Sequence, residues 1–266
     1  MAADGGGVSL DNAEAWDIGA ALGDICEAAA SVIMPFWRAG VTVRAKADDS
    51  PVTEADHQGE ALILAALAER WPDIPTISEE HASEFGAPDA IGPHFFLVDP
   101  IDGTKAFVRG DKNFTVNIAL IAHGRPVAGA VGAPATGELW HTGVGGAMKR
   151  VRGGTPAPIR VRAWPTGSAR AVLSHTIKEA ADMALESTYG YSRRELMDSS
   201  IKFCRIAEGA ADIYPRHGPT MEWDIAAGHA VLAAAGGRLT TPQGDAFIYG
   251  KADQGFRNGW FVARGG

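Results

Sequence analysis

Two carboxylates stand out in the segment Asp99-Pro-Ile-Asp-Gly-Thr104, which directly follows the apolar run Phe95–Val98. The apolar run predicts a strand, and the proline and the glycine predict a turn at its end. A turn of this kind can leave backbone carbonyls exposed beside the two carboxylates, Asp99 and Asp102. Mg²⁺ is a hard cation that prefers carboxylate and carbonyl oxygens. The segment is therefore either a site for two cations or an ordinary Asp-rich turn.

Further acidic groups occur at positions where secondary structure changes. The pair Glu79-Glu80 follows a β-like run, and Asp224 lies in the first turn of an Ala-rich helical segment. Asp224 has an ordinary explanation as a carboxylate at a helix N-terminus. The segment Thr53-Glu-Ala-Asp56 likewise fits a capping box. The histidines form no pair with metal-ligand spacing, so the sequence does not support a zinc site.

Composition limits the classes of protein to be considered. The chain has 266 residues, of which 46% are hydrophobic and 21% charged, with a formal net charge of -8. These proportions are typical of a folded globular protein, and an acidic surface argues against binding to nucleic acid or anionic lipid. Met1–Asn12 lacks the pattern of a signal peptide, no apolar run is expected to span a membrane, and the cytoplasm is the expected compartment. Cys26 and Cys204 are expected to be buried thiols.

Helical and β-like patterns alternate along the first half of the chain. Apolar residues at helical spacing predict a helix over 16–37, and a second helix is predicted over 54–70, ended by Pro72. The β-like runs that follow cover residues 75–77, 94–98, 114–121, 127–132 and 138–143.

The Gly-, Pro- and Arg-rich stretch 149–158 predicts a boundary between an N-terminal unit, 1–150, and a C-terminal unit, 151–266. In the second unit we predict helices over 176–187, 199–209 and 223–235, strands near 170–174, 211–214, 238–240 and 260–262, and a loop over 189–198. Strands and helices mixed in both units indicate an α+β or layered α/β architecture.

The order of three motifs carries a resemblance to a known family. Ser78-Glu-Glu80, Asp99–Thr104 and Trp223-Asp224 before an Ala-rich helix together resemble the inositol monophosphatase-like phosphatases. The resemblance covers nearly the whole chain. It implies a layered α-β-α-β-α sandwich, Mg²⁺ dependence and inhibition by Li⁺.

The resemblance also implies roles for individual residues. Two or three Mg²⁺ ions would be bound by the side chains of Glu79, Asp99, Asp102 and Asp224 and the carbonyl of Ile101. Thr104 would orient the attacking water, and Asp56 would accept the proton of the Thr104 hydroxyl. Glu79 would hold a further water. The backbone amides of Gly103 and Thr104 would bind phosphate oxygens.

Several stretches, among them 102–107, 114–120 and 199–204, are most similar to the bisphosphate nucleotidases of this family. This similarity implies hydrolysis of the 3′-phosphate of adenosine 3′,5′-bisphosphate to give AMP and phosphate. Ser199, Ser200 and Lys202 would contact the substrate, with Arg216 as a further candidate. Helix capping and solvated charge are the ordinary roles of such residues.

Alternatives remain within and outside this class. His217 stands seven residues before Asp224, where inositol monophosphatases carry a sugar-binding Glu, which argues against inositol phosphate as the main substrate. An inositol, histidinol or sugar phosphatase is the first alternative, and a non-catalytic binding protein is the second. Segment 183–197 has no counterpart that we can place. The oligomeric state is open, and a homodimer is one possibility.

Overall fold

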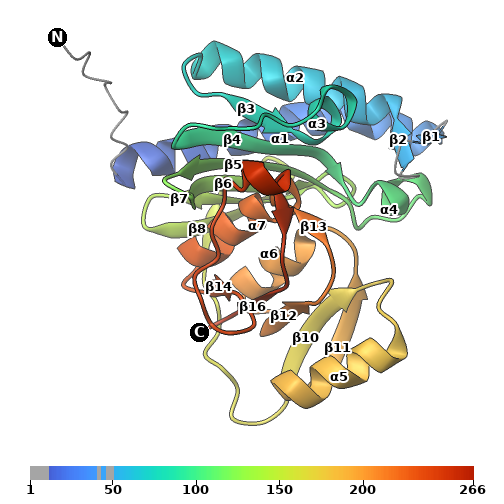
Figure 1. Cartoon of the computed structure of the whole chain (residues 1–266), viewed down its shortest axis with the longest axis vertical. Helices are drawn as coiled ribbons and strands as arrows, with labels where there is room; N and C mark the ends of the chain where they lie inside the picture. Colours follow the sequence, from blue (N-terminus) through green and yellow to red (C-terminus); the bar gives the residue numbers. More distant parts are fainter. Residues whose placement is uncertain (1–11, 41–42, 46–50) are drawn as a thin grey trace.

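The computed structural model describes residues 12–40, 43–45 and 51–266, which form alternating layers of helices and sheets (Figure 1). The helices are α1 (Asn12–Ala39), α2 (Glu54–Arg70), α3 (Glu79–Phe85), α4 (Thr104–Val108), α5 (Glu179–Tyr189), α6 (Ile201–Ala207), α7 (Glu222–Ala234) and the 3₁₀ turn η1 (Ala252–Gln254).

The strands belong to two large sheets and two short ribbons. The first large sheet has the order β3-β4-β5-β6-β7-β8-β9, and only β3 and β4 are parallel in it. Its strands are β3 (Thr76–Ser78), β4 (His94–Asp102), β5 (Thr115–Ala122), β6 (Arg125–Ala133), β7 (Glu138–Gly143), β8 (Gly146–Val151) and β9 (Ala157–Ile159).

The second large sheet is mixed and has the order β11-β10-β12-β16-β14. Its strands are β10 (Ala169–Ser174), β11 (Tyr191–Met197), β12 (Ile213–Arg216), β14 (Arg238–Thr240) and β16 (Phe261–Arg264). The ribbons pair β1 (Val43–Ala45) with β2 (Pro51–Thr53), and β13 (Thr220–Met221) with β15 (Arg257–Asn258).

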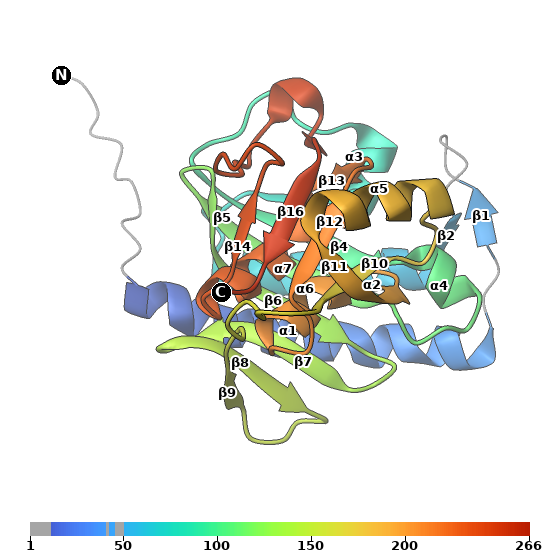
Figure 2. The ribbon, with the colours of Figure 1, turned by 90° about the horizontal axis from the view of Figure 1, so that it is seen from below.

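Helices cover both faces of each large sheet. Helices α1 and α2 lie on the outer face of the first sheet, and α6 and α7 lie between the two sheets (Figure 1). Figure 2 shows the second sheet from the side that α5 covers. This arrangement confirms the α-β-α-β-α sandwich expected from the resemblance.

Strand β4 shows why the first sheet needs helices on both faces. Phe96 and Val98 pack into the cluster beneath α1 and α2, whereas Phe95 and Leu97 pack toward α7. Successive side chains of a strand point to opposite faces, so a strand buried on both faces is apolar throughout. The run Phe95–Val98 is therefore the sequence signature of a central strand.

Helix α1 corrects one expectation from the sequence. By length and composition Asp17–Ala39 could span a membrane, although no such run was expected. Its Leu22, Ile25 and Ile33 are nevertheless buried against the first sheet, and half of the apolar window is buried. This is the packing of a core helix in a globular domain. The first eleven residues lie outside the described part of the chain.

Other boundaries agree with the sequence or differ for local reasons. Helix α2 and strand β7 have the predicted limits, and both cysteines are buried thiols. Strand β4 continues to Asp102 instead of ending before Asp99, since the turn is accommodated as an irregularity in its pairing with β5. The predicted boundary at residue 150 falls inside β8, and the first sheet continues to residue 159.

The predicted loop over 189–198 is wrong, because most of it forms β11. This strand is at the edge of its sheet, and the residues between Tyr191 and Met197 are exposed. A register shift in its pairing with β10 also interrupts the alternation. An exposed, irregular edge strand lacks the apolar period of two from which strands are predicted.

Candidate active site

The bulged end of β4 forms the floor of the site. The Asp99 carboxylate accepts a hydrogen bond from the backbone N–H of Ile101 at 3.0 Å, which holds the turn. Gly103 follows at φ +91°, a left-handed conformation that favours glycine, and α4 begins at Thr104. A Cβ at Gly103 would lie 3.1 Å from the Asn113 carbonyl oxygen, so there is little room for a side chain at this position of the turn.

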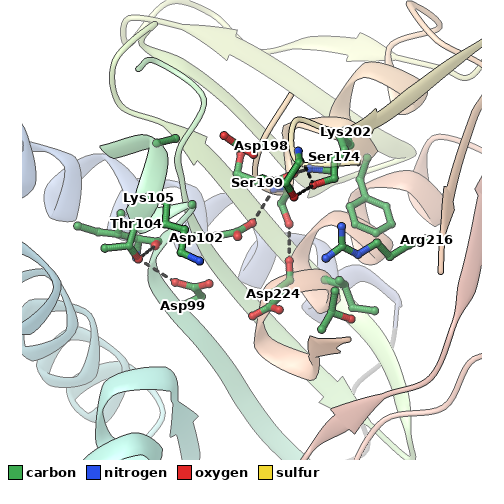
Figure 3. Close-up of a pocket in the computed structure, with 18 of the residues that line it drawn as sticks. Asp99, Asp102, Thr104, Lys105, Ser174, Asp198, Ser199, Lys202, Arg216 and Asp224 are labelled. Carbon is green, nitrogen blue, oxygen red and sulfur yellow. Dashed lines mark hydrogen bonds between the residues drawn. The ribbon is translucent and has the colours of Figure 1, made fainter. Parts of the chain in front are cut away.

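Glu79 and Asp224 reach the same floor from other elements. Glu79 begins α3 after β3, which runs parallel to β4. Asp224 lies in the first turn of α7, where its Oδ2 accepts a hydrogen bond from the Met221 N–H at 2.8 Å. Carboxylate oxygens of Glu79, Asp99 and Asp224 lie within 4.8 Å of one another. Figure 3 shows Asp99 and Asp224 facing each other, with Asp102 beside them.

The electrostatics of this cluster favour a bound cation. Burial, followed by the charges of Glu79, Asp102 and Asp224, raises the pKa of Asp99 well above its ordinary value. Burial and the charges of Asp102 and Glu79 also raise the pKa of Asp224. The pKa of Asp102 is raised to about 6, mainly by burial. Converging carboxylates suit Mg²⁺, because the ion takes oxygen ligands and neutralises their repulsion.

A buried amide connects this floor to the second half of the chain. Asn117 on β5 is fully buried, and its Nδ2 lies 3.3 Å from both Asp102 Oδ2 and Ser200 Oγ. The Ser200 N–H donates to Asp102 Oδ2 at 2.6 Å. No role for Asn117 is predicted from the sequence. The signal for one is an amide side chain within the mostly apolar run 114–121.

The opposite wall carries positive charge. The cavity has a volume of about 460 Å³, and Lys202 and Arg216 line it across from the carboxylates. Lys202 is 4% exposed and donates hydrogen bonds to the carbonyls of Ser199, at 2.6 Å, and Met197, at 3.2 Å. Burial lowers the pKa of Lys202 to about 8. Arg216 points into the cavity, and among the described residues its Nε has no hydrogen-bond partner (Figure 3).

The structure brings nearly all the predicted site residues to this cavity. Those lining it are Glu79, Asp99, Ile101, Asp102, Gly103, Thr104, Ser199, Ser200, Lys202 and Asp224. Lining residues without a role predicted from the sequence include Lys105, Arg109, Ser174, Thr176 and Asp198. Lys105 belongs to the stretch 102–107 that carries the family resemblance, and Ser174 and Thr176 belong to a predicted strand and a predicted helix. Arg109 and Asp198 lie outside the motifs that carry the resemblance.

Asp56 is instead buried at the start of α2. Its Oδ2 accepts a hydrogen bond from the Thr53 backbone N–H at 2.8 Å, as the capping box requires, and another from the Thr53 hydroxyl at 2.6 Å. The Thr104 hydroxyl donates to the Ile101 carbonyl at 3.1 Å. Proton transfer from Thr104 to Asp56 therefore stays a prediction.

His217 follows the last residue of β12. Its ring stacks on Trp260 with centroids 4.6 Å apart and planes 9° apart. Its Nε2 lies 3.0 Å from the Tyr189 hydroxyl. The ring thus contacts aromatic residues, and its neighbour Arg216 lines the cavity.

Comparison with known sequences identifies related proteins. Residues 15–260 match the inositol monophosphatase family. The 3′(2′),5′-bisphosphate nucleotidase CysQ of Escherichia coli strain K12 is 41% identical over 213 residues, covering 78% of this chain and 82% of that protein. The protein of the same name from Buchnera aphidicola is 36% identical over 248 residues, covering 91% of this chain and 92% of that protein.

A solved structure agrees with these sequence matches. The crystal structure of CysQ from Bacteroides thetaiotaomicron, described as a bacterial member of the inositol monophosphatase family, superposes with a TM-score of 0.73. The two sequences are 29% identical, and the match covers 94% of this chain and 97% of the other.

Proposed function

Because this chain belongs to the inositol monophosphatase family, we propose that it is a Mg²⁺-dependent phosphatase whose substrate is adenosine 3′,5′-bisphosphate. Hydrolysis of the 3′-phosphate gives AMP and inorganic phosphate. Relatives named 3′(2′),5′-bisphosphate nucleotidase, which match over most of this chain, support the substrate class.

The observation that carries this proposal is that one cavity has an acidic region and a basic region. Carboxylates of Glu79, Asp99 and Asp224 converge on its floor, and Lys202 and Arg216 line its wall. A phosphate being cleaved needs cations at the reacting centre, whereas a second phosphate needs only a complementary charge. A bisphosphate matches both regions at once.

The four acidic side chains of the floor and the Ile101 carbonyl would hold two or three Mg²⁺ ions. Bound there, Mg²⁺ lowers the pKa of water and stabilises charge on the attacking and leaving oxygens. The hydroxyl of Thr104 is proposed to orient the attacking water, and Glu79 to hold a further water. The amides of Gly103 and Thr104 would bind oxygens of the scissile phosphate. Attack of the water oxygen at phosphorus breaks the bond between phosphorus and the 3′-oxygen of the nucleotide. The 3′-oxygen takes up a proton and leaves as the hydroxyl of AMP.

The second phosphate is assigned to the wall. Arg216 lines the cavity, and its buried Nε has no hydrogen-bond partner among the described residues. Lys202 can add a charge from its buried position. Ser199 and Ser200 lie between this wall and the Asp102 carboxylate and are proposed to contact the substrate. His217, in place of a sugar-binding carboxylate, supports a nucleotide over inositol phosphate.

We also propose that the protein acts in the cytoplasm on small soluble phosphate esters. Its net charge of -8 disfavours nucleic acid as a partner. A homodimer is compatible with the family assignment and is tested by sedimentation of the purified protein.

The first experiment measures phosphate release from adenosine 3′,5′-bisphosphate and inositol 1-phosphate in parallel, with Mg²⁺ and with EDTA. We expect Mg²⁺-dependent release mainly from the nucleotide, and inhibition of that release by Li⁺. Preference for inositol phosphate would retain the metal site and refute the nucleotide assignment. Release from neither substrate would point to another phosphate ester or to binding without catalysis.

A further inference from the structure

A short turn between β11 and α6 holds the Lys202 charge of the cationic wall in place. We call residues 197–200 the specificity turn, because its serines line the cavity and its carbonyls hold Lys202. Ser199 has φ +58°, a left-handed conformation that is unfavourable for a residue with a side chain. A strained residue of this kind persists only when the surrounding structure holds it in place.

Two contacts inside the cavity hold the turn from below. The Ser200 N–H donates to the Asp102 carboxylate, and the ammonium of Lys202 binds the carbonyl oxygens of Ser199 and Met197. The position of the Lys202 charge therefore depends on the conformation of this turn. A small displacement of the turn would move that charge relative to the metal-binding floor.

A third contact also joins the turn to the first half of the chain. Arg109, directly after α4, donates through Nη2 to Asp198 Oδ2 at 2.9 Å and through Nε to Asp111 Oδ2 at 2.9 Å. Arg109 and Asp198 both line the cavity, so their ion pair bridges its two walls. Asp198 adjoins Ser199 in the view of Figure 3. Segment α4 continues directly from the Asp99–Thr104 turn, which links this contact to the floor.

We propose that the Arg109–Asp198 ion pair positions the specificity turn, and with it the Lys202 charge, relative to the floor of the site. Arg109 is thus a positioning residue for discrimination between bisphosphate and monophosphate substrates. The choice of substrates in this inference rests on the proposed function, whereas the contacts from which it is argued are independent of that function. The pair is partly exposed, with side chains 43% and 19% accessible, so its contribution to global stability is small.

The kinetic test compares Arg109→Gln, Asp198→Asn and the double variant with the wild type. The substrates are adenosine 3′,5′-bisphosphate and adenosine 3′-monophosphate, which lacks the second phosphate. For each single variant we expect KM for the bisphosphate to rise about three- to tenfold, with kcat nearly unchanged and little effect on the monophosphate. The double variant should be no worse than the single variants, because either one already breaks the pair.

Two matched controls distinguish loss of the Arg109–Asp198 ion pair from loss of charge elsewhere on the protein. Arg194→Gln breaks a partly exposed ion pair between β11 and α5, in which Arg194 Nε lies 2.7 Å from Oδ2 of the buried Asp182. Asp111→Asn removes the other partner of Arg109 and leaves Asp198 in place. Neither control should change the ratio of the two KM values. A change of equal size in either control would overturn the proposal.

Hydrogen exchange tests the positioning without any substrate. In Arg109→Gln we expect faster exchange of the Ser200 amide and its neighbours in the specificity turn, with unchanged exchange in the central strands β4 and β5. Unchanged exchange in this turn, together with an unchanged KM ratio, would refute the inference. If the wild type cleaves neither nucleotide, the proposed function fails, and the exchange experiment alone decides whether Arg109 holds the turn.

Discussion

Two clusters of buried or partly buried charge in this protein differ in composition, since one is acidic and the other is balanced. The first is the acidic floor, where Glu79, Asp99, Asp102 and Asp224 converge. The second is a network around Trp140, in which Lys149 Nζ lies 2.7 Å from oxygens of both Glu138 and Glu208. Arg205 Nη1 lies 2.6 Å from Glu208, so two acids meet two bases.

The same burial has opposite net results in the two clusters. In the floor, burial and neighbouring carboxylates act together and raise the pKa of Asp99 and Asp224. In the network, burial alone would raise the pKa of Glu208, but hydrogen bonds from Lys149, Arg205 and Trp140 hold the pKa below its ordinary value. A balanced network stabilises the fold, whereas a cluster of like charge costs stability and indicates function.

Removing a carboxylate from the floor should have the largest effect. In Asp99→Asn we expect kcat/KM to fall roughly a thousandfold, because the variant removes one of the anionic groups proposed to hold Mg²⁺ at the reacting centre. The amide oxygen can still accept the hydrogen bond from Ile101, so the turn is preserved. In EDTA the variant should unfold at the same temperature as the wild type or a higher one, because repulsion is relieved. Lower thermal stability in EDTA would contradict the comparison.

The network should behave in the opposite way. In Glu208→Gln we expect the free energy of unfolding at pH 7 to fall by about 2 kcal/mol, since a charge-assisted hydrogen-bond network is broken. The kcat should stay near the wild-type value. Glu27→Gln, which removes an exposed ion pair with Arg150, is the matched control and should change stability by less than about 0.5 kcal/mol.

The difference in free energy of unfolding between the wild type and Glu208→Gln should depend on pH with a defined sign. The pKa of Glu208 is lower in the folded state than its ordinary value of 4.5. The stability that Glu208 contributes is therefore complete above that value and is lost as the pH falls through the folded pKa. Urea unfolding between pH 7 and pH 3 should show the wild type and Glu208→Gln converging at the acidic end. A constant difference over this range would mean that charge is not the cause.

Binding of Mg²⁺ should stabilise the protein through the acidic floor and not through the network around Trp140. At a concentration a hundredfold above Kd, we expect Mg²⁺ to add about 2.7 kcal/mol to the free energy of unfolding. Thermal denaturation with Mg²⁺ or EDTA measures this difference. It should be greatly reduced in Asp224→Asn and retained in Glu208→Gln. A Mg²⁺ effect of equal size in Asp224→Asn would exclude that carboxylate as a ligand.

The smallest expected effect distinguishes a helix-capping role of Asp56 from a catalytic one. Thr53→Ala removes the hydroxyl that caps α2, and we expect it to lower the free energy of unfolding by about 1 kcal/mol. Its kcat should stay within about twofold of the wild type. Asp56→Asn should lower kcat as well if Asp56 accepts the Thr104 proton. An unchanged kcat in Asp56→Asn would leave the carboxylate with the capping role alone.

Predictions from the sequence succeeded where short-range interactions decide the structure. Helix α2 begins after Thr53, and its capping box needs contacts over only three residues. The turn at Asp99 depends on a side-chain contact with the N–H two residues later. Pro100 restricts its own φ, and Gly103 allows a left-handed one. These constraints are properties of a few adjacent residues, so they can be read without the fold.

Prediction failed where packing decides the structure. The sequence predicts a loop where strand β11 lies, since the exposed edge position of this strand leaves no apolar period in the sequence. Arg109 and Asp198 are 89 residues apart, and Asn117 and Ser200 are 83 apart. No local pattern relates such pairs. They meet because apolar faces on both sides of α6 and α7 hold the two sheets together.

The family, the carboxylates of the floor and the turn that presents them were readable from the sequence. How the second half of the chain meets that floor depends on the folded structure, which places the specificity turn, the buried Lys202 and the ion pair across the cavity. The difference lies in the range of the interactions. Hydrogen bonds within a turn are set by neighbouring residues, whereas the placement of a charge across a cavity is set by burial of the core between the two sheets.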